Sequence, residues 1–376
     1  MRITHARVMF CALIAFGAPT TGPLMAAQRA PLIAPLSARL TSKPSIGLPQ
    51  ELSPAANPVF VAELCAGSAY ITASCSPAEG LVYRLDGRPI TEGVANPVAM
   101  AVDKSGSLYV SNAVTVDAGN VTVYAADSGR LMRVLTGFRG DSYALAFSPG
   151  GNLYVVSHYK DGCCEIRGSV AVYAPGKALP ARRLSDVSSF PGKPAFDASG
   201  NFYQPNFDNF PGFISVYVPG ANAPYRTIND GIGFPLALTF DTHGQLYVLN
   251  GIFAGGTDIL VYPRDGDSPS ITITAGVSNA SAIALDSSGD LYVANRGQGD
   301  VPSSVSVYAP GTSEPMRTIQ TGINVPSALA FDAAGNLYVA NAPVEGANTV
   351  TVYAPGAVIP EKVHRLSETP TALAVP

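Results

Sequence analysis

The chain has 376 residues, of which 47% are hydrophobic and 13% are charged, so it holds enough apolar material for a large buried core. Its formal charge of −4 and its lack of a Lys/Arg-rich run exclude nucleic acid as an expected partner and argue against binding to an anionic membrane. Long helices tolerate its 37 glycines and 32 prolines poorly, so the composition favours many short strands joined by turns.

Residues 1–27 have the pattern of an export signal. Arg2 and Arg7 give a basic start, residues 8–16 form an apolar run, and the small residues Ala26 and Ala27 suit a signal peptidase. The alternative is a membrane anchor, which would need an apolar run about twice as long. We expect cleavage, export to the periplasm or the extracellular space, and no membrane span in the mature chain.

Residues 28–57 contain five prolines among Ala, Ser and Leu and show no sustained hydrophobic period. Such a composition is typical of a flexible linker. We therefore place the folded domain at residues 58–376.

Four cysteines remain once the signal is removed: Cys65, Cys75, Cys163 and Cys164. An even number in an exported chain permits disulfides, and the connectivity stays open. The adjacent pair Cys163 and Cys164 could close on itself. The alternatives are free thiols or bonds to Cys65 or Cys75.

A repeat with a period of about 45 residues fills the rest of the chain. The phrase ALAFDAAGNLYVAN at residues 328–341 recurs at 282–295 and 237–250, and earlier copies begin at Ala99, Ala144 and Lys193. Two tyrosine columns mark the period. The first holds Tyr70, Tyr109, Tyr154, Tyr203, Tyr247, Tyr292 and Tyr338, and the second holds Tyr83, Tyr124, Tyr173, Tyr217, Tyr262, Tyr308 and Tyr353. This period is typical of the blades of a β-propeller.

Each repeat predicts four short strands, a to d, which in the last full copy are residues 327–331, 337–341, 349–354 and 361–366. Asp332 stands three residues before Gly335, the arrangement of a hairpin turn. The Asp at this position of each repeat is therefore predicted to form the turn rather than to catalyse. The b strands are apolar at consecutive positions, which indicates a sheet covered on both faces.

The two ends of the domain predict a closed ring. Residues 371–375 read as a lone a strand, and the b, c and d strands of the N-terminal repeat are expected at about residues 69–93. Joining them completes a seventh blade and removes the exposed edges that a solenoid, the rival architecture, would leave. Residues 59–63 are an alternative for the same slot. We predict an all-β fold, a seven-bladed β-propeller of four-stranded antiparallel blades.

The phrase pair AxAxDxxGNLYVAN and VxVYAPG resembles the NHL-type repeats of secreted bacterial proteins, from about residue 56 to the C-terminus. The resemblance implies the propeller fold and says little about function, because the recurring residues are those that build a blade. The architecture is similar, more distantly, to lactonases and lyases that hold a metal at the central channel. Their motifs do not align with this chain, so no catalytic residue is carried over.

Residues that interrupt the repeat in the b–c and d–a loops are the functional candidates, because these loops gather on one face of a propeller. The blade 3 insertion at residues 158–167 carries charges and the cysteine pair, and blades 4 to 6 add aromatic and charged residues. The candidate ligand-binding residues are His158, Tyr159, Lys160, Asp208, Phe210, Phe253 and Arg296. The alternatives are a solvated loop held by the Cys163–Cys164 disulfide, and aromatic rings packed over the blades.

A polar column ends the b strands: Asn112, Ser157, Asn206, Asn250, Asn295 and Asn341. These side chains could ring a metal or a sugar, but Asn at such a position more often caps its own loop. The histidines of the mature chain, His158, His243 and His364, fall in different parts of the repeat, so they form no catalytic triad with Ser and Asp.

These observations predict an exported, non-catalytic binding scaffold that acts as a monomer on an unidentified protein, peptide or glycan and requires no cofactor. The alternative is a metal-assisted lactonase or lyase, with a divalent metal at the channel mouth. A redox role for Cys163 and Cys164 is a third hypothesis.

Overall fold

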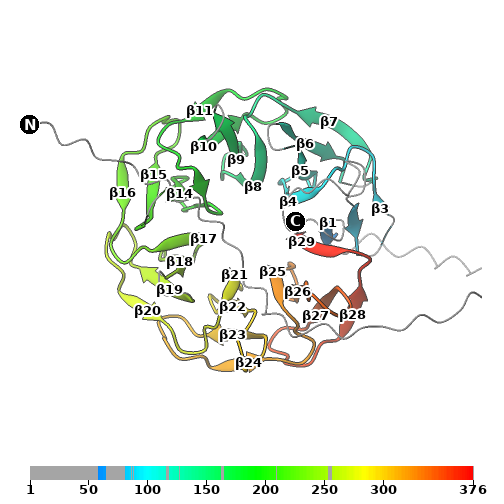
Figure 1. Ribbon diagram of the computed structural model, residues 1–376, viewed down its shortest axis with the longest axis vertical. Coiled ribbons are helices and arrows are strands. Elements are labelled where there is room, and N and C mark those ends of the chain that lie inside the picture. Colours follow the sequence, from blue (N-terminus) through cyan, green and yellow to red (C-terminus); the bar gives the residue numbers. More distant parts are fainter. Residues whose placement is uncertain are drawn as a thin grey trace, which may run out of the picture. The chain divides into compact units, whose positions relative to one another are not determined.

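The computed structural model describes residues 58–64, 81–85, 87, 89–115, 118–126, 128–161, 165–208, 210–252 and 256–375. Within these ranges seven sheets surround a central axis in chain order, and the C-terminal strand lies beside the N-terminal sheet (Figure 1). No helix in the described ranges is long and apolar enough to span a membrane. The predicted signal peptide and linker lie outside the described residues.

Blades 2 to 4 follow the N-terminal strands, each with its innermost strand first. Blade 2 contains β4 (Pro97–Val102), β5 (Leu108–Thr115), β6 (Ala118–Tyr124) and β7 (Leu131–Leu135). Blade 3 contains β8 (Asp141–Phe147), β9 (Leu153–Asp161), β10 (Glu165–Tyr173) and β11 (Arg182–Leu184). Blade 4 has a divided inner strand and contains β12 (Phe190–Pro191), β13 (Ala195–Phe196), β14 (Phe202–Phe207), β15 (Phe213–Tyr217) and β16 (Arg226–Ile228).

Blades 5 to 7 repeat the same antiparallel order. Blade 5 contains β17 (Phe234–Phe240), β18 (Leu246–Gly251), β19 (Thr257–Tyr262) and β20 (Ile271–Ile273). Blade 6 contains β21 (Ala280–Leu285), β22 (Leu291–Asn295), β23 (Ser304–Tyr308) and β24 (Arg317–Ile319). Blade 7 contains β25 (Pro326–Phe331), β26 (Leu337–Asn341), β27 (Thr349–Tyr353) and β28 (Lys362–Arg365).

Blade 1 closes the ring in the order β29 (Thr369–Ala374), β1 (Phe60–Leu64), β2 (Leu81–Arg84) and β3 (Pro89–Ile90). The predicted C-terminal closing strand is confirmed. The placement of strand b near Tyr70 is wrong, because β1 takes that slot and Tyr70 lies outside the described residues. Residues 59–63 are therefore the neighbour of the closing strand and not its competitor.

The c strand of blade 1 also departs from the tyrosine column. Tyr83 lies opposite Val61, whereas in blade 7 Tyr353 lies opposite Leu337. The inner strands of blades 1 and 7 each contain a β-bulge, and aligning the two blades at this bulge places Val61 at the position of Val339. Tyr83, the partner of Val61, therefore stands two residues before the position that Tyr353 occupies in blade 7. The tyrosine count predicted the right number of blades, although both tyrosines of this blade were assigned to the wrong places.

The Asp residues of the a–b turns form those turns, as predicted. Asp332 Oδ1 accepts the backbone N–H groups of Ala334 (3.0 Å) and Asn336 (2.8 Å), and Gly335 takes a φ of 81°. Asp103, Asp241 and Asp286 accept the equivalent pairs of amides. Each carboxylate satisfies two backbone donors of a tight hairpin, which is a structural role.

Tyrosines fill the spaces between blades. In blades 2 to 7 the tyrosine that ends strand c is at most 1% exposed. Its hydroxyl donates a hydrogen bond to a backbone carbonyl in the connection from the preceding blade. Tyrosines of strand b meet the inner strand of the next blade edge-on, as Tyr292 does with Phe331 at a centroid distance of 4.9 Å. These contacts explain why tyrosine recurs with the blade period.

Candidate functional site at the loop-face mouth of the channel

The asparagines that end the b strands are buried inside their blades. Asn341 Oδ1 accepts the backbone N–H of Asn324 (2.9 Å), and its amide donates to Thr349 (3.1 Å) and Thr351 (3.2 Å). The same bond to the preceding d–a loop is made by Asn112, Asn206, Asn250 and Asn295. These side chains therefore cap loops, as predicted. The capped loop is d–a rather than b–c, and a ring of inward amides for a metal or sugar is not formed.

Glu63 occupies the corresponding place in blade 1. It lies opposite Pro370 in the register, as Asn341 lies opposite Pro326. Its side chain is 0% exposed and accepts a hydrogen bond from the Ser367 hydroxyl (2.8 Å). Burial raises the pKa of the Glu63 carboxyl, and the hydrogen bonds from Ser367 and the backbone of Glu368 partly oppose that rise. In the sequence, the only indication of this buried carboxyl was a charged residue inside the apolar segment FVAEL.

The blade 3 insertion is a β-hairpin arm rather than a loop. Strands β9 and β10 stay paired as far as Asp161 and Glu165. Arg139 donates to the Tyr159 hydroxyl (3.0 Å), with its guanidinium 5.1 Å from the ring centroid, and Lys160 is exposed. The tip of the arm is exposed, and within it Arg167 forms ion pairs with Asp161 (2.8 Å) and Glu165 (2.9 Å). The predicted Cys163–Cys164 disulfide lies outside the described residues.

His158 stands at the base of this arm. Its ring lies 5.7 Å from that of Tyr143, and its backbone pairs with Asp141 of the inner strand. Burial lowers the pKa of His158, which favours the neutral imidazole at physiological pH. The Tyr143 hydroxyl is buried and has no hydrogen-bond partner within the described residues, and its burial raises the Tyr143 pKa well above the usual range.

An aromatic shelf, defined as Phe190, Phe207, Phe210 and Phe234, covers the loop face of blades 4 and 5. The ring of Phe234 lies 4.1 Å from that of Phe207 and 5.7 Å from that of Phe210, measured between centroids. Phe190 pairs with Phe207 across the strands, and Phe190 and Phe210 are 54% and 50% exposed. Two rings therefore pack on the blades, and two present apolar surface to solvent.

Two other predicted residues of this region have different outcomes. Asp208 Oδ1 accepts the backbone N–H of Ser189, so this carboxylate is already engaged by the d–a loop of its own blade. Phe253 lies outside the described residues. Blade 5 also contributes Phe234 to this surface.

Lys193 is a residue that the sequence analysis did not select. It lies in the innermost strand region of blade 4, between β12 and β13, and its backbone bonds to blade 5 through Leu236 O (2.9 Å) and Leu238 N (3.2 Å). The other six blades have alanine at this register: Ala99, Ala144, Ala237, Ala282, Ala328 and Ala372. The signal was visible, because one copy of the repeated phrase begins with Lys.

Gly192 fixes how Lys193 is held. A Cβ at Gly192 would lie 2.4 Å from the carbonyl oxygen of Pro235, so no other residue fits without displacing the backbone of blade 5. The inner strands of blades 4 and 5 thereby approach closely, and Lys193 is anchored to the wall of the channel. Its side chain retains exposed surface although protein surrounds it on most sides, and this burial lowers its pKa.

Arg296 comes directly after Asn295, at the loop-face end of β22 in blade 6. Arg296 keeps exposed surface, and partial burial of its charge lowers its pKa. After burial, the charge of Arg296 is the second cause of the lowered pKa of Lys193. Within the described part of the chain neither side chain takes part in an ion pair.

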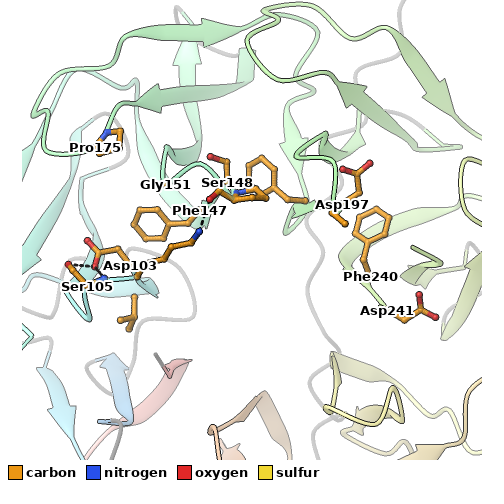
Figure 2. Close-up of a pocket in the computed structure, with 14 residues that line it drawn as sticks. Asp103, Ser105, Phe147, Ser148, Gly151, Pro175, Asp197, Phe240 and Asp241 are labelled. Atoms are coloured by element: carbon orange, nitrogen blue, oxygen red, sulfur yellow. Dashed lines mark hydrogen bonds between the residues drawn. The ribbon is translucent and has the colours of Figure 1, made fainter. Parts of the chain in front are cut away.

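A cavity of about 570 Å³ opens on the opposite face, among the a–b turns of blades 2 to 5 (Figure 2). Its lining includes Asp103, Asp197 and Asp241, whose carboxylates accept hydrogen bonds within their own turns. Lys104 donates to the carbonyl of Pro149 (2.8 Å). The polar groups of this cavity are thus committed to the hairpins. Among the described residues no group of three or more His, Cys, Asp and Glu could hold a metal ion.

Comparison with known proteins yields likenesses to solved structures only. No protein-family model and no curated protein matches the chain. Two structures named "putative 6-phosphogluconolactonase" are similar. The one from Bacteroides uniformis has a TM-score of 0.62 at 16% identity, covering 85% of this chain and 98% of that chain. The one from Bacteroides fragilis has a TM-score of 0.60 at 16% identity, covering 86% of this chain and 99% of that chain.

A protein from Lactobacillus plantarum has a TM-score of 0.64 at 14% identity, covering 85% of this chain and 98% of that chain. The chain is a seven-bladed β-propeller. At these identities the likeness shows the fold alone. The resemblance to NHL-type repeats stays a prediction.

Proposed function

We propose that this propeller is a ligand-binding protein that acts through the b–c and d–a loop face of blades 3 to 6, outside the cytoplasm and without catalysis. The aromatic shelf carries the proposal. Phe190 and Phe210 expose about half of their surfaces on the same loop face, and each belongs to a group of rings linked through Phe207 and Phe234. Exposed rings on a preformed scaffold are typical of recognition surfaces for glycans and peptides.

Two features support a preformed site. The ring of Phe234 packs against those of Phe207 and Phe210, and the backbone of Phe190 pairs with that of Phe207, which supports a surface formed before a ligand arrives. Gly212 N donates to the carbonyl of Gly233 (2.7 Å), which joins the b–c loop of blade 4 to the d–a loop that enters blade 5. A ligand would therefore incur little cost for ordering the surface.

Calorimetric titration of the purified chain with a panel of oligosaccharides and short peptides tests this proposal. We expect at least one of them to bind, and the double variant Phe190→Ser/Phe210→Ser to bind it at least ~10-fold more weakly. Ile359→Ser is the matched control, because Ile359 is 67% exposed in the c–d loop of blade 7 on the opposite face. Equal affinity of the double variant and the wild type would contradict the shelf as the site.

Lactone hydrolysis is the second candidate, and the similarity to the two Bacteroides structures favours it. Its metal-assisted form lacks support from a cluster of metal-ligating side chains in the described part of the chain. An assay of γ- and δ-lactone hydrolysis, with added divalent metals and after chelation, separates the candidates. Turnover that depends on the protein would replace the binding proposal, whereas a rate equal to that of buffer leaves it in place.

A further inference from the structure

The cavity among the a–b turns of blades 2 to 5 has one aromatic ring from each of three consecutive blades in its lining. Phe147, Phe196 and Phe240 end the innermost strands of blades 3, 4 and 5, and each is half-buried. The volume of about 570 Å³ falls within the range of roughly 300–1,000 Å³ that is typical of small-molecule sites. This cavity therefore has the size and the apolar surface of a ligand site.

The construction of a blade does not require these rings. At the same register blade 2 has Val102 and blade 6 has Leu285. Leu285 belongs to the same hydrophobic cluster as Tyr247, the b-strand tyrosine of the preceding blade, so an aliphatic side chain suffices to cover that tyrosine. Three consecutive phenylalanines thus add aromatic surface at the cavity beyond what the packing of the repeat needs.

Neighbouring tyrosines hold the three rings in place. Each ring meets the b-strand tyrosine of the preceding blade edge-on, at centroid distances of 4.9, 4.9 and 4.8 Å in the pairs Tyr109–Phe147, Tyr154–Phe196 and Tyr203–Phe240. The lining is therefore formed before a ligand arrives, and binding incurs little cost for ordering it.

The charge around the rings is negative. Figure 2 shows Asp103 and Phe147 on one side of this cavity and Phe240 and Asp241 on the other. The carboxylates of the lining accept hydrogen bonds from backbone amides, which engage their oxygens but leave their negative charge. Within the described residues Asp103 and Asp197 form no ion pair, and Asp241 has His243 as its ion-pair partner, at 3.8 Å.

Positive charge in the lining is limited to Lys104, whose ammonium donates to the carbonyl of Pro149. The strand-d arginines of blades 2 to 4 donate to tyrosine hydroxyls and are not part of the lining: Arg133, Arg182 and Arg226. Three carboxylates and one ammonium thus surround the apolar surface, and this balance favours a cationic ligand over an anionic one.

We propose that this cavity binds a small organic cation, an ammonium group attached to an apolar body, on the face opposite the aromatic shelf. The faces of aromatic rings attract cations, and the carboxylates of the a–b turns add to that attraction. The apolar body would cover the phenylalanine rings and remove their surface from water. The site shares no residue with the shelf, so the inference goes beyond the proposed function and does not depend on it.

Calorimetric titration with benzyltrimethylammonium at low ionic strength tests the site. Benzyl alcohol and phenylacetate are the neutral and anionic comparison probes, because they keep the aromatic body and change the charge. We expect the wild type to bind the cation, and to bind the other two probes at least ~10-fold more weakly. Added sodium chloride should weaken the binding of the cation, since it screens the carboxylates.

The triple variant Phe147→Leu/Phe196→Leu/Phe240→Leu tests the rings. Leucine stands at this register in blade 6, so the substitutions are compatible with the repeat. We expect the variant to bind benzyltrimethylammonium at least ~5-fold more weakly than the wild type. Phe331→Leu is the matched control, because Phe331 ends the inner strand of blade 7 at the same register and is not part of the lining.

The double variant Asp197→Asn/Asp241→Asn tests the charges without changing the core. Asparagine keeps an acceptor for the turn amides and removes the negative charge. We expect at least ~3-fold weaker binding of the cation. Asp286→Asn/Asp332→Asn is the matched control, because it makes the same change in the a–b turns of blades 6 and 7, outside the lining.

The outcomes decide this inference separately from the proposed function. No binding of benzyltrimethylammonium, or equal affinity for phenylacetate, overturns the cation site. Equal affinities of the charge variant and its control overturn it as well, even if the triple variant does not fold. Phe190→Ser/Phe210→Ser should bind the cation as the wild type does, because the shelf lies on the other face, so loss of the shelf proposal would leave this site in place.

Discussion

The hydroxyl of Thr371 in the last strand donates a hydrogen bond to the backbone carbonyl of Pro97, 274 residues earlier, at a distance of 2.8 Å. Consecutive blades make the same bond, from Ser281 to Pro326 O (2.6 Å) and from Ser327 to Pro370 O (3.1 Å). In each inner strand, the residue that donates this hydrogen bond is the extra residue of a β-bulge. The closing strand β29 is therefore joined to blade 2 by the same contact that joins blades along the chain.

Thr371→Val tests this contact. The substitution keeps the shape of the side chain and removes the donor, which leaves the carbonyl of Pro97 without this partner. We expect a loss of about 1–2 kcal/mol in the free energy of unfolding, measured by urea denaturation. Thr312→Val is the control, because the hydroxyl of exposed Thr312 bonds only within its own turn, to Ala309 O and Glu314 O. Equal losses in the two variants would contradict an interblade role.

Removal of residues 369–376 tests whether β29 is needed for closure. The deletion would expose the edge of β1, whose Val61 and Ala62 are 0% exposed in the intact ring. An unpaired apolar edge promotes association between chains. We expect a lower thermal midpoint and oligomers in size-exclusion chromatography, whereas a monomer with an unchanged midpoint would show that the ring does not depend on this strand.

Glu63→Gln tests the buried carboxyl in blade 1. Burial raises the pKa of Glu63 above its ordinary value of 4.5, so the folded state binds the proton more tightly than the unfolded state. The stability that Glu63 contributes is then greatest below about pH 4.5 and declines as the pH rises through the folded-state pKa.

A neutral amide does not titrate in this range, so the variant lacks this decline. We expect the variant to gain stability relative to the wild type between pH 4 and pH 7, as measured by urea denaturation across that range. The comparison cancels the contributions of other titrating groups. A difference between the two proteins that is the same at both ends of the range would show that Glu63 does not titrate anomalously.

Asn341→Ala tests the role of the b-strand asparagines. The substitution leaves the backbone N–H of Asn324 without its acceptor and the buried Thr351 hydroxyl without its amide donor. We expect a loss of about 1–3 kcal/mol in the free energy of unfolding by chemical denaturation. Asn341→Ser is a useful comparison, because blade 3 has Ser157 in this column. A stability equal to that of the wild type for the Ala variant would contradict the capping role.

Lys193→Met tests the cost of the channel charge in the absence of a ligand. Methionine keeps an apolar stem of similar length and removes the repulsion by Arg296 together with the desolvation of the ammonium. We expect a higher thermal midpoint than that of the wild type in chloride buffer of low ionic strength. A lower midpoint would show that Lys193 stabilises the ring by a contact of its ammonium group.

Most of the architecture was predictable because a blade is built from local contacts that recur at one spacing. Asp332 and Gly335 define their hairpin within four residues, and the same spacing recurs in other blades. Apolar residues at consecutive positions, as in β26, indicated blades covered on both faces, and seven repeats determined the number of blades.

Contacts between distant segments were decided only in three dimensions. The segment FVAEL carries neither the tyrosine nor the asparagine of the other b strands, so its place beside β29 follows from pairing across some 300 residues, as the bond between Ser367 and Glu63 illustrates. The same holds for the candidate site. His158, Phe210 and Arg296 could be selected because they interrupt the repeat, but the hydrogen bonds of Lys193 to the inner strand of blade 5 depend on how the blades close around the channel.

The sequence by itself thus determined the blade, the turn chemistry and the closing strand, because each rests on residues that lie near one another along the chain or repeat at a constant interval. The tertiary structure alone decided which strand completes blade 1 and which loop the asparagines cap. Those features depend on the angle and separation between blades, and no spacing within a single repeat encodes them.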